Sequence, residues 1–183
     1  GSNAVKSSGI TFDSVDLTSC SGNNSVGYNA FTGATVKKLL INDNGVKNNS
    51  ESNSSSYPFY GVNGFTTLQI KSGTSRIYNV LSDSMRNSIT EVIGFNIPKT
   101  FSNNVFASCK NLKTEYTISS KVTSIGNNAF KDSGIIFTSV DLTSCSGNSS
   151  VGYNAFTGTT VKKLVVNNNG VKNNSESGSS SYP

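Results

Sequence analysis

The sequence contains no histidine. This absence excludes Ser-His-Asp and Cys-His catalysis and every metal site that needs an imidazole ligand. The glycines occur singly, so no glycine-rich loop is available to cradle a phosphate. Residues 42–44 resemble a calcium loop weakly, but such a loop needs more carboxylates, and the second copy of this segment has Asn168 in place of Asp43. We therefore expect neither a metal ion nor a cofactor.

Acidic residues are also few, ten in 183, and none forms a tight pair along the chain. The best candidates for a pair are Glu115 and Asp141, which lie on neighbouring predicted strands. A glycosidase needs two carboxyl groups roughly 5 to 9.5 Å apart. We favour the simpler interpretation, two solvated charges on the face of a sheet. The sequence therefore predicts a protein without enzymatic activity.

Only three cysteines are present, Cys20, Cys109 and Cys145. Cys20 and Cys145 are equivalent positions of a repeated segment. If five strands separate them, at roughly 4.8 Å per strand, they lie roughly 24 Å apart, which is far beyond the reach of a disulfide. No cysteine has a second cysteine nearby to share a metal ion. We expect three free, buried thiols.

Charged residues make up only 14% of the chain, and the net charge of +5 is scattered. The one basic cluster is a lysine pair, Lys37 and Lys38, which recurs as Lys162 and Lys163. A nucleic-acid site would need a basic stripe with stacking aromatic residues. No apolar run approaches the roughly 18 residues of a membrane span. We expect no nucleic-acid partner and no membrane-embedded segment.

The sequence does contain a long internal repeat. Residues 8–58 and 133–183 are nearly identical, offset by 125, and differ at eight of 51 positions. Such a repeat is typical of an array of stacked units. We interpret residues 5–183 as one solenoid fragment, with one 125-residue unit at about 8–132 and part of a second at 133–183, and we expect the parent protein to continue. Residues 1–4 (GSNA) resemble what remains of a cleaved expression tag.

A shorter period lies inside the long one. Aromatic or methionine residues recur at intervals of 28, 26, 21, 24 and 26, at Phe31, Phe59, Met85, Phe106, Phe130 and Phe156. After most of them comes a turn and then a run of alternating apolar and polar residues. These runs predict strands at 11–17, 36–41, 65–70, 92–97, 112–118, 136–142 and 161–166. One strand per 21–28 residues indicates a solenoid with a parallel sheet and little helix.

The motif at residues 122–135 (VTSIGNNAFKDSGI) resembles the signature of BspA-like leucine-rich repeats. Weaker versions lie at 26–33, 151–158, 105–113 and 96–101. The resemblance implies a mainly β, right-handed leucine-rich-repeat solenoid with a short second strand on the convex side of each coil. It also implies display on the cell surface or secretion, and binding to a protein of the host matrix or of another cell. The longer loops at 42–58 and 167–183 depart from the family pattern.

The outward residues of the predicted strands form a candidate binding face, because one residue between the last two inward positions points outward in each strand. These residues are Asp16, Leu40, Gln69, Asn96, Thr117, Asp141 and Val165. Leu40 and Val165 are apolar in a column that is otherwise polar. Tyr57 and Tyr182, each before a proline, are candidate loop contacts, since tyrosine is frequent at interfaces. An ordinary solvated sheet and ordinary loop packing are the alternatives.

These features together favour a non-enzymatic adhesion module that binds an extracellular protein. Two other functions are compatible with the same sequence: a stiff spacer that presents another domain, and a carbohydrate-binding accessory module. A spacer should be evenly polar, whereas a binding module should show an apolar or aromatic patch on one face. An exposed aromatic platform would favour carbohydrate. The sequence does not indicate an oligomeric state.

Overall fold

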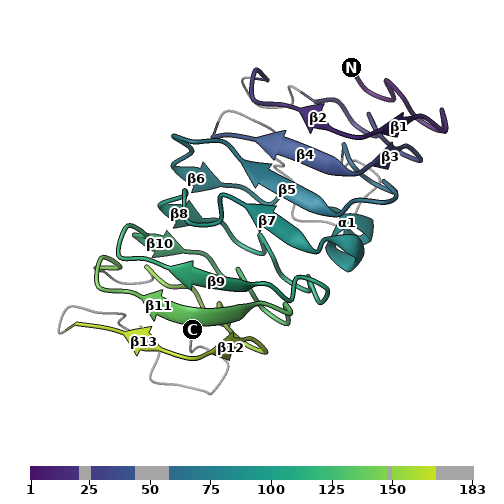
Figure 1. The fold of residues 1–183 in the computed structure, drawn as a ribbon. Helices are drawn as coiled ribbons and strands as arrows, with labels where there is room; N and C mark the ends of the chain where they lie inside the picture. The colour runs from purple at the N-terminus through teal and green to yellow at the C-terminus, as the bar shows by residue number, and fades with distance from the viewer. Residues whose placement is uncertain (21–25, 44–57, 148–149, 168–183) are drawn as a thin grey trace.

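The chain folds into a stack of coils, each of which places a short strand beside the strand of the next coil (Figure 1). The computed structural model describes residues 1–20, 26–43, 58–147 and 150–167. Every strand pair in these residues is parallel. The one helix within them is six residues long. The mainly β solenoid with little helix that the sequence predicts is therefore confirmed.

The main face of the stack is made by strands that fall inside the predicted runs or within one residue of them. In chain order they are β1 (Thr11–Phe12), β2 (Val15–Asp16), β3 (Thr35–Val36), β4 (Lys38–Ile41), β5 (Thr67–Ile70), β7 (Glu91–Ile93), β9 (Glu115–Ile118), β11 (Ile136–Asp141), β12 (Thr160–Val161) and β13 (Leu164–Val165). Inward residues pair with inward residues. Leu68, for example, faces Leu39 on one side and Val92 on the other. Because side chains alternate between the two faces of a strand, the outward residues also align in a row.

A second, smaller sheet lies on the other side of the coils. It contains β6 (Arg76–Ile77), β8 (Thr100–Phe101) and β10 (Ser124–Ile125), paired in the order β10-β8-β6. Strand β10 falls within the motif at 122–135, where the family resemblance implies a second strand. Ile125 also forms an isolated parallel bridge with Val151, the equivalent position of the next coil.

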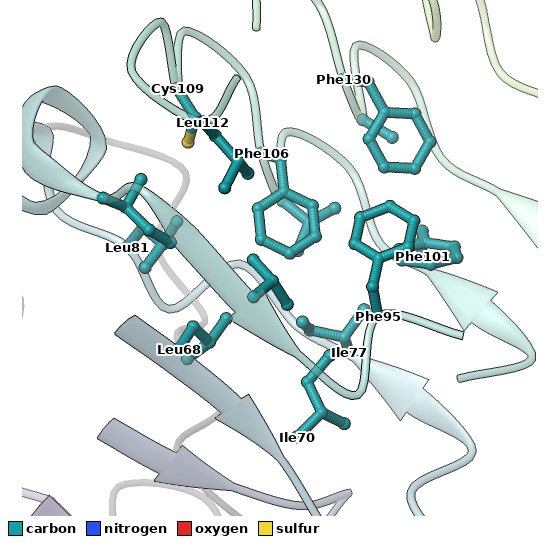
Figure 2. Close-up of a cluster of buried hydrophobic side chains, with 14 of the residues drawn as sticks. Leu68, Ile70, Ile77, Leu81, Phe95, Phe101, Phe106, Cys109, Leu112 and Phe130 are labelled. Atoms are coloured by element: carbon teal, nitrogen blue, oxygen red, sulfur yellow. The ribbon is translucent and has the colours of Figure 1, made fainter. Parts of the chain in front are cut away.

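Phenylalanine rings fill the space between the two sheets (Figure 2). The rings of Phe106 and Phe130 are parallel within 11° at 6.2 Å, and Phe130 meets Phe137 edge-on at 5.1 Å. Each such pair adds about 0.5–1.5 kcal/mol beyond the burial of its area. Of the six repeating positions, four are fully buried, namely Phe59, Met85, Phe106 and Phe130. Phe31 and Phe156, near the two ends of the stack, are partly buried.

One predicted strand is shorter than expected. The run at 92–97 ends at Ile93, because Gly94 turns the backbone with φ +80°. A Cβ at this position would lie 2.7 Å from the carbonyl oxygen of Ile70 and 2.7 Å from a methyl carbon of Ile97, so only glycine fits. The turn brings Phe95 into the core, where it stacks on Tyr116 at 4.3 Å. Asn96 consequently lies in the turn and not on the sheet face.

The helix α1 (Asp83–Ser88) occupies the coil that contains Met85. It is fixed by Arg86, which is 8% exposed. The Arg86 guanidinium donates to the carbonyl oxygens of Ala107 at 2.6 Å and Asn104 at 2.8 Å, and to the side-chain oxygen of Asn79. These acceptors satisfy a buried cation that forms no ion pair with a carboxylate among the described residues. Arg86 therefore joins the helical coil to the coil that follows it.

The first coil begins at the N-terminus itself. The backbone N–H groups of Asn3, Val5 and Ser7 donate to carbonyl oxygens of the next coil at 2.7, 2.8 and 2.7 Å. Residues 1–9 match residues 126–134 at six of nine positions, with the same offset of 125. Although residues 1–4 resemble a tag remnant, the structure includes them in the stack, and the long repeat extends upstream of Ser8.

Candidate binding site on the main sheet

Three of the predicted face residues lie in one row. Asp16 on β2 pairs with Leu40 on β4, and Leu40 pairs with Gln69 on β5. The next residue of the row is Ile93 on β7, which pairs with Gln69. The prediction of Asn96 for this place is wrong, since the turn at Gly94 ends the strand three residues earlier. The apolar character of the row at Leu40 is therefore repeated at Ile93, which is 39% exposed.

The other three face residues do not form one continuous row. Thr117 pairs with Ser139 and Ile118 pairs with Val140, so Thr117 lies two residues out of register with Asp141; β11 also contains an irregularity between Phe137 and Ser139. The extra residue, Thr138, places its hydroxyl 2.7 Å from the Thr117 hydroxyl. Asp141 pairs with Val165 on β13, as Asp16 pairs with Leu40. The column predicted from the sequence is therefore divided into separate parts.

The first row lines a hollow of about 400 Å³ at the carboxyl ends of its strands. The residues around it are Asp16, Thr18, Leu40, Gln69, Ile70, Lys71, Ser72, Ile93, Gly94 and Ile97. The hollow exists because β5 continues to Ile70, whereas the backbone that follows β7 turns inward at Gly94. Its position depends on the same glycine that shortens β7. Lys71, Ile93 and Ile97 were not predicted from the sequence. The signal that could have indicated the end of the strand at Ile93 is the glycine that follows it.

The lining combines apolar and charged groups. Leu40, Ile93 and Ile97 supply aliphatic surface, and Asp16 and Lys71 supply one charge of each sign. Lys71 is exposed, and its lining neighbours include no aromatic side chain. This composition suits an uncharged or mixed-charge ligand with an apolar group, since pockets orient their ligands through a few polar groups placed around an apolar floor.

Asp16 is held in a defined position by Thr18. The backbone N–H of Thr18 donates to Oδ1 of Asp16 at 2.8 Å. Hydrogen bonds from the Thr18 side chain and backbone hold the pKa of Asp16 below its usual value, and the charge of Lys71 lowers it further. The carboxylate therefore stays ionised at neutral pH and presents a fixed negative charge at the rim of the hollow.

The second copy repeats half of this arrangement. Asp141 accepts hydrogen bonds from the backbone N–H of Thr143 at 3.0 Å and from its hydroxyl at 2.6 Å. These bonds lower the pKa of Asp141 as their counterparts lower that of Asp16. Gln69, Lys71 and Ile93 lie outside residues 8–58, the segment that recurs at 133–183.

Glu115 and Asp141 are not close enough to act as a catalytic pair. Glu115 pairs with Ile136 at one end of β11, and Asp141 lies at the other end. Five residues of extended strand separate the two positions by roughly 16 Å. Glu115 also forms an ion pair with Lys162. In the first copy the equivalent Lys37 pairs with Asp13, which the second copy replaces with Thr138.

The cysteines are free, as expected. Burial raises the pKa of Cys109 to about 12 and that of Cys145 to about 11. Cys20 is only partly buried, so the expectation of three fully buried thiols is correct for two of them. Tyr57, Tyr182 and Asn44 lie outside the described residues. Among the residues that the structure describes, no three His, Cys, Asp or Glu side chains are grouped to hold a metal ion.

Comparison with protein families matches the BspA type leucine-rich repeat region to residues 24–164, in six copies. The chain belongs to this family. Searches of curated proteins and of solved structures give no significant match. The matched range includes the motif at 122–135, which therefore identified the family correctly. Within the described residues of this BspA-type chain, no helix is long and apolar enough to cross a membrane.

Proposed function

We propose that this chain is a protein-binding module of a secreted or cell-surface protein and that it acts as an adhesin without catalysing a reaction. Members of the BspA-type repeat family are repeat proteins that are often surface-associated and bind other proteins, and they are generally non-enzymatic. The proposed partner is an extracellular protein of the host matrix or of another cell. The observation that supports binding most directly is the hollow beneath Leu40 and Ile93.

The hollow favours a binding module over a spacer. A stiff stalk needs only a continuous core and an evenly polar surface. Here, however, Leu40 and the 39% exposed Ile93 bring aliphatic groups to the outward row of the main sheet. Exposed aliphatic residues weaken the solubility of a stalk without a compensating benefit. They are useful in a recognition site, where a central apolar contact ringed by polar groups supplies most of the binding energy.

A carbohydrate-binding role receives less support. None of the described residues that line the hollow is aromatic, so they offer no platform on which a sugar ring could stack. The exposed tyrosines of the described residues are Tyr28, Tyr60 and Tyr153, and none of them belongs to the hollow. The protein-binding proposal is therefore favoured over the accessory-module alternative.

Direct binding to purified extracellular-matrix proteins tests the proposal. The full chain is immobilised and its binding is measured by biolayer interferometry, beside a chain with Leu40→Thr and Ile93→Thr as the matched surface variant. We expect saturable binding to at least one matrix protein and at least a tenfold weaker Kd for the variant. Binding that is absent, or equal for both chains across the panel, would count against the function proposed.

A further inference from the structure

The charged residues at the hollow are arranged to recognise a ligand that carries charges of its own. Asp16 stands on β2 at one side, with its carboxylate fixed by Thr18. Lys71 follows directly after β5. The aliphatic residues Leu40 and Ile93 lie in the same row as Asp16. A complementary ligand therefore presents an apolar group to the floor, a cation to Asp16 and an anion to Lys71.

The size of the row indicates how much of a ligand it can accommodate. From β2 to β7 there are three strand spacings, which is roughly 14 Å at 4.8 Å each. An extended polypeptide covers roughly 3.3 Å per residue. A segment of about four residues therefore crosses the row from Asp16 to Ile93. The hollow volume of about 400 Å³ lies within the range of sites that bind small ligands or single anchoring side chains.

The other ligand classes fit this chemistry less well. A nucleic acid would bring phosphates towards the ionised carboxylate of Asp16, and the described lining residues include no aromatic ring on which a base could stack. A peptide, by contrast, can combine an apolar side chain with a basic and an acidic one within four residues.

We propose that the hollow binds a short extended peptide segment whose aliphatic or aromatic side chain covers Leu40 and Ile93. A basic side chain of the segment pairs with Asp16, and an acidic one pairs with Lys71. This inference rests on the proposed protein-binding function and specifies the part of the partner that is recognised.

The internal repeat supplies the matched control. Asp141, Thr143 and Val165 reproduce the chemistry of Asp16, Thr18 and Leu40, with the same strand pairing. None of Asp141, Thr143 and Val165 is among the residues around the hollow. Substitutions of Asp141 and Val165 therefore change comparable side chains while leaving the hollow intact.

Selection from a random heptapeptide display library on the full chain tests the inference. Enriched sequences are synthesised with a fluorophore, and Kd is measured by fluorescence polarisation. We expect enriched peptides to combine an aliphatic or aromatic residue with a basic and an acidic one. Ile93→Thr, Leu40→Thr and Asp16→Asn should each weaken binding by about tenfold, the change that corresponds to loss of one well-placed contact. Val165→Thr and Asp141→Asn should change Kd by less than about twofold, as expected away from the contact.

Circular dichroism and thermal midpoints confirm that each variant is folded. Threonine, the residue introduced at positions 40 and 93, is β-branched and suits a strand. Enriched peptides that bind the Ile93→Thr chain as tightly as the original chain would overturn the inference but not the proposed protein-binding function. The peptide inference would also be overturned if no peptide were enriched. It would be overturned equally if the chain bound oligosaccharides and the Ile93→Thr chain did not. The protein-binding function fails only if the matrix-protein assay is also negative.

Discussion

The phenolic oxygen of Tyr116 accepts a hydrogen bond from the backbone N–H of Val92 at 2.8 Å. In a continuous parallel sheet a carbonyl oxygen of the next strand would accept this bond. Strands β7 and β9, both fully described, are not joined by ladder pairing, and they belong to different sheets. Tyr116 pairs with Phe137 on β11, and its side chain reaches back towards β7 to satisfy the donor. The main face is therefore interrupted beside Ile93, at the edge of the hollow.

Removing the Tyr116 hydroxyl should destabilise the fold. Tyr116→Phe keeps the ring stacked on Phe95 but leaves the buried N–H of Val92 without an acceptor. The expected loss in the free energy of unfolding is about 1–3 kcal/mol. Urea denaturation measures it. Tyr153→Phe, at a tyrosine that is 47% exposed, is the control and should change little. Equal effects of the two substitutions would contradict the assigned role of Tyr116.

The turn at Gly94 should tolerate no side chain. Gly94→Ala introduces a Cβ at positive φ and within 2.7 Å of the Ile70 carbonyl oxygen. Gly73→Ala provides the comparison, because Gly73 has a φ of +85° but open space around the added Cβ. We expect Gly73→Ala to cost about 1–2 kcal/mol from backbone strain alone. Gly94→Ala should cost about 1–3 kcal/mol more, since overpacking is added. Thermal and urea unfolding of both variants decide whether the close contact matters.

Arg86 should contribute to stability through its hydrogen bonds to the neighbouring coil. Arg86→Met retains a long side chain but removes the donors to Ala107, Asn104 and Asn79. We expect a loss of about 1.5–3 kcal/mol, the range for hydrogen bonds to a charged group. The exposed Arg76 provides the comparison, and Arg76→Met should alter stability by no more than about 0.5 kcal/mol. A stability of Arg86→Met equal to that of the original chain would argue against the proposed role of these bonds.

The three thiols should react at different rates in the folded chain. Cys20 is partly exposed, whereas Cys109 and Cys145 are fully buried. At pH 8 a disulfide reagent such as dithionitrobenzoate should therefore modify one thiol quickly and the other two only after unfolding in urea. Mass spectrometry of the labelled peptides identifies the site. Labelling of Cys109 as fast as Cys20 would show that the coil around Cys109 opens readily.

The buried thiol of Cys109 should also make stability depend on pH. Its folded pKa is raised from an ordinary value of 9.0 to about 12, so folding favours the protonated form. The resulting stabilisation is present below pH 9 and is lost as the pH rises towards 12. Between pH 8 and pH 11 the original chain should lose about 2–3 kcal/mol more than a Cys109→Ala chain, at 1.36 kcal/mol per pKa unit. Parallel pH profiles for the two chains would contradict the raised pKa.

The periodicity of the sequence was sufficient to predict the repeat architecture. A coil cannot bury its apolar face alone, so aromatic and aliphatic residues must recur once per coil. The positions of Phe59, Phe106 and Phe130 follow from this requirement, and each is fully buried. The second strand at Ser124–Ile125 was likewise indicated by the family motif.

The sequence by itself determined the stacking of coils, the core residues and the family, because these depend on a spacing that repeats along the chain. Only the tertiary structure decided which outward residues meet. The glycine at position 94 ends strand β7 early and opens the hollow. As a result Ile93, and not the predicted Asn96, pairs with Gln69 in the outward row. The register of β9 against β11 places Thr117 opposite Ser139, two residues before Asp141. Side chains alternate with a period of two, so a shift of one residue changes which face a side chain occupies. Pairing between coils, and not the alternation within each run, therefore sets the composition of the candidate binding site.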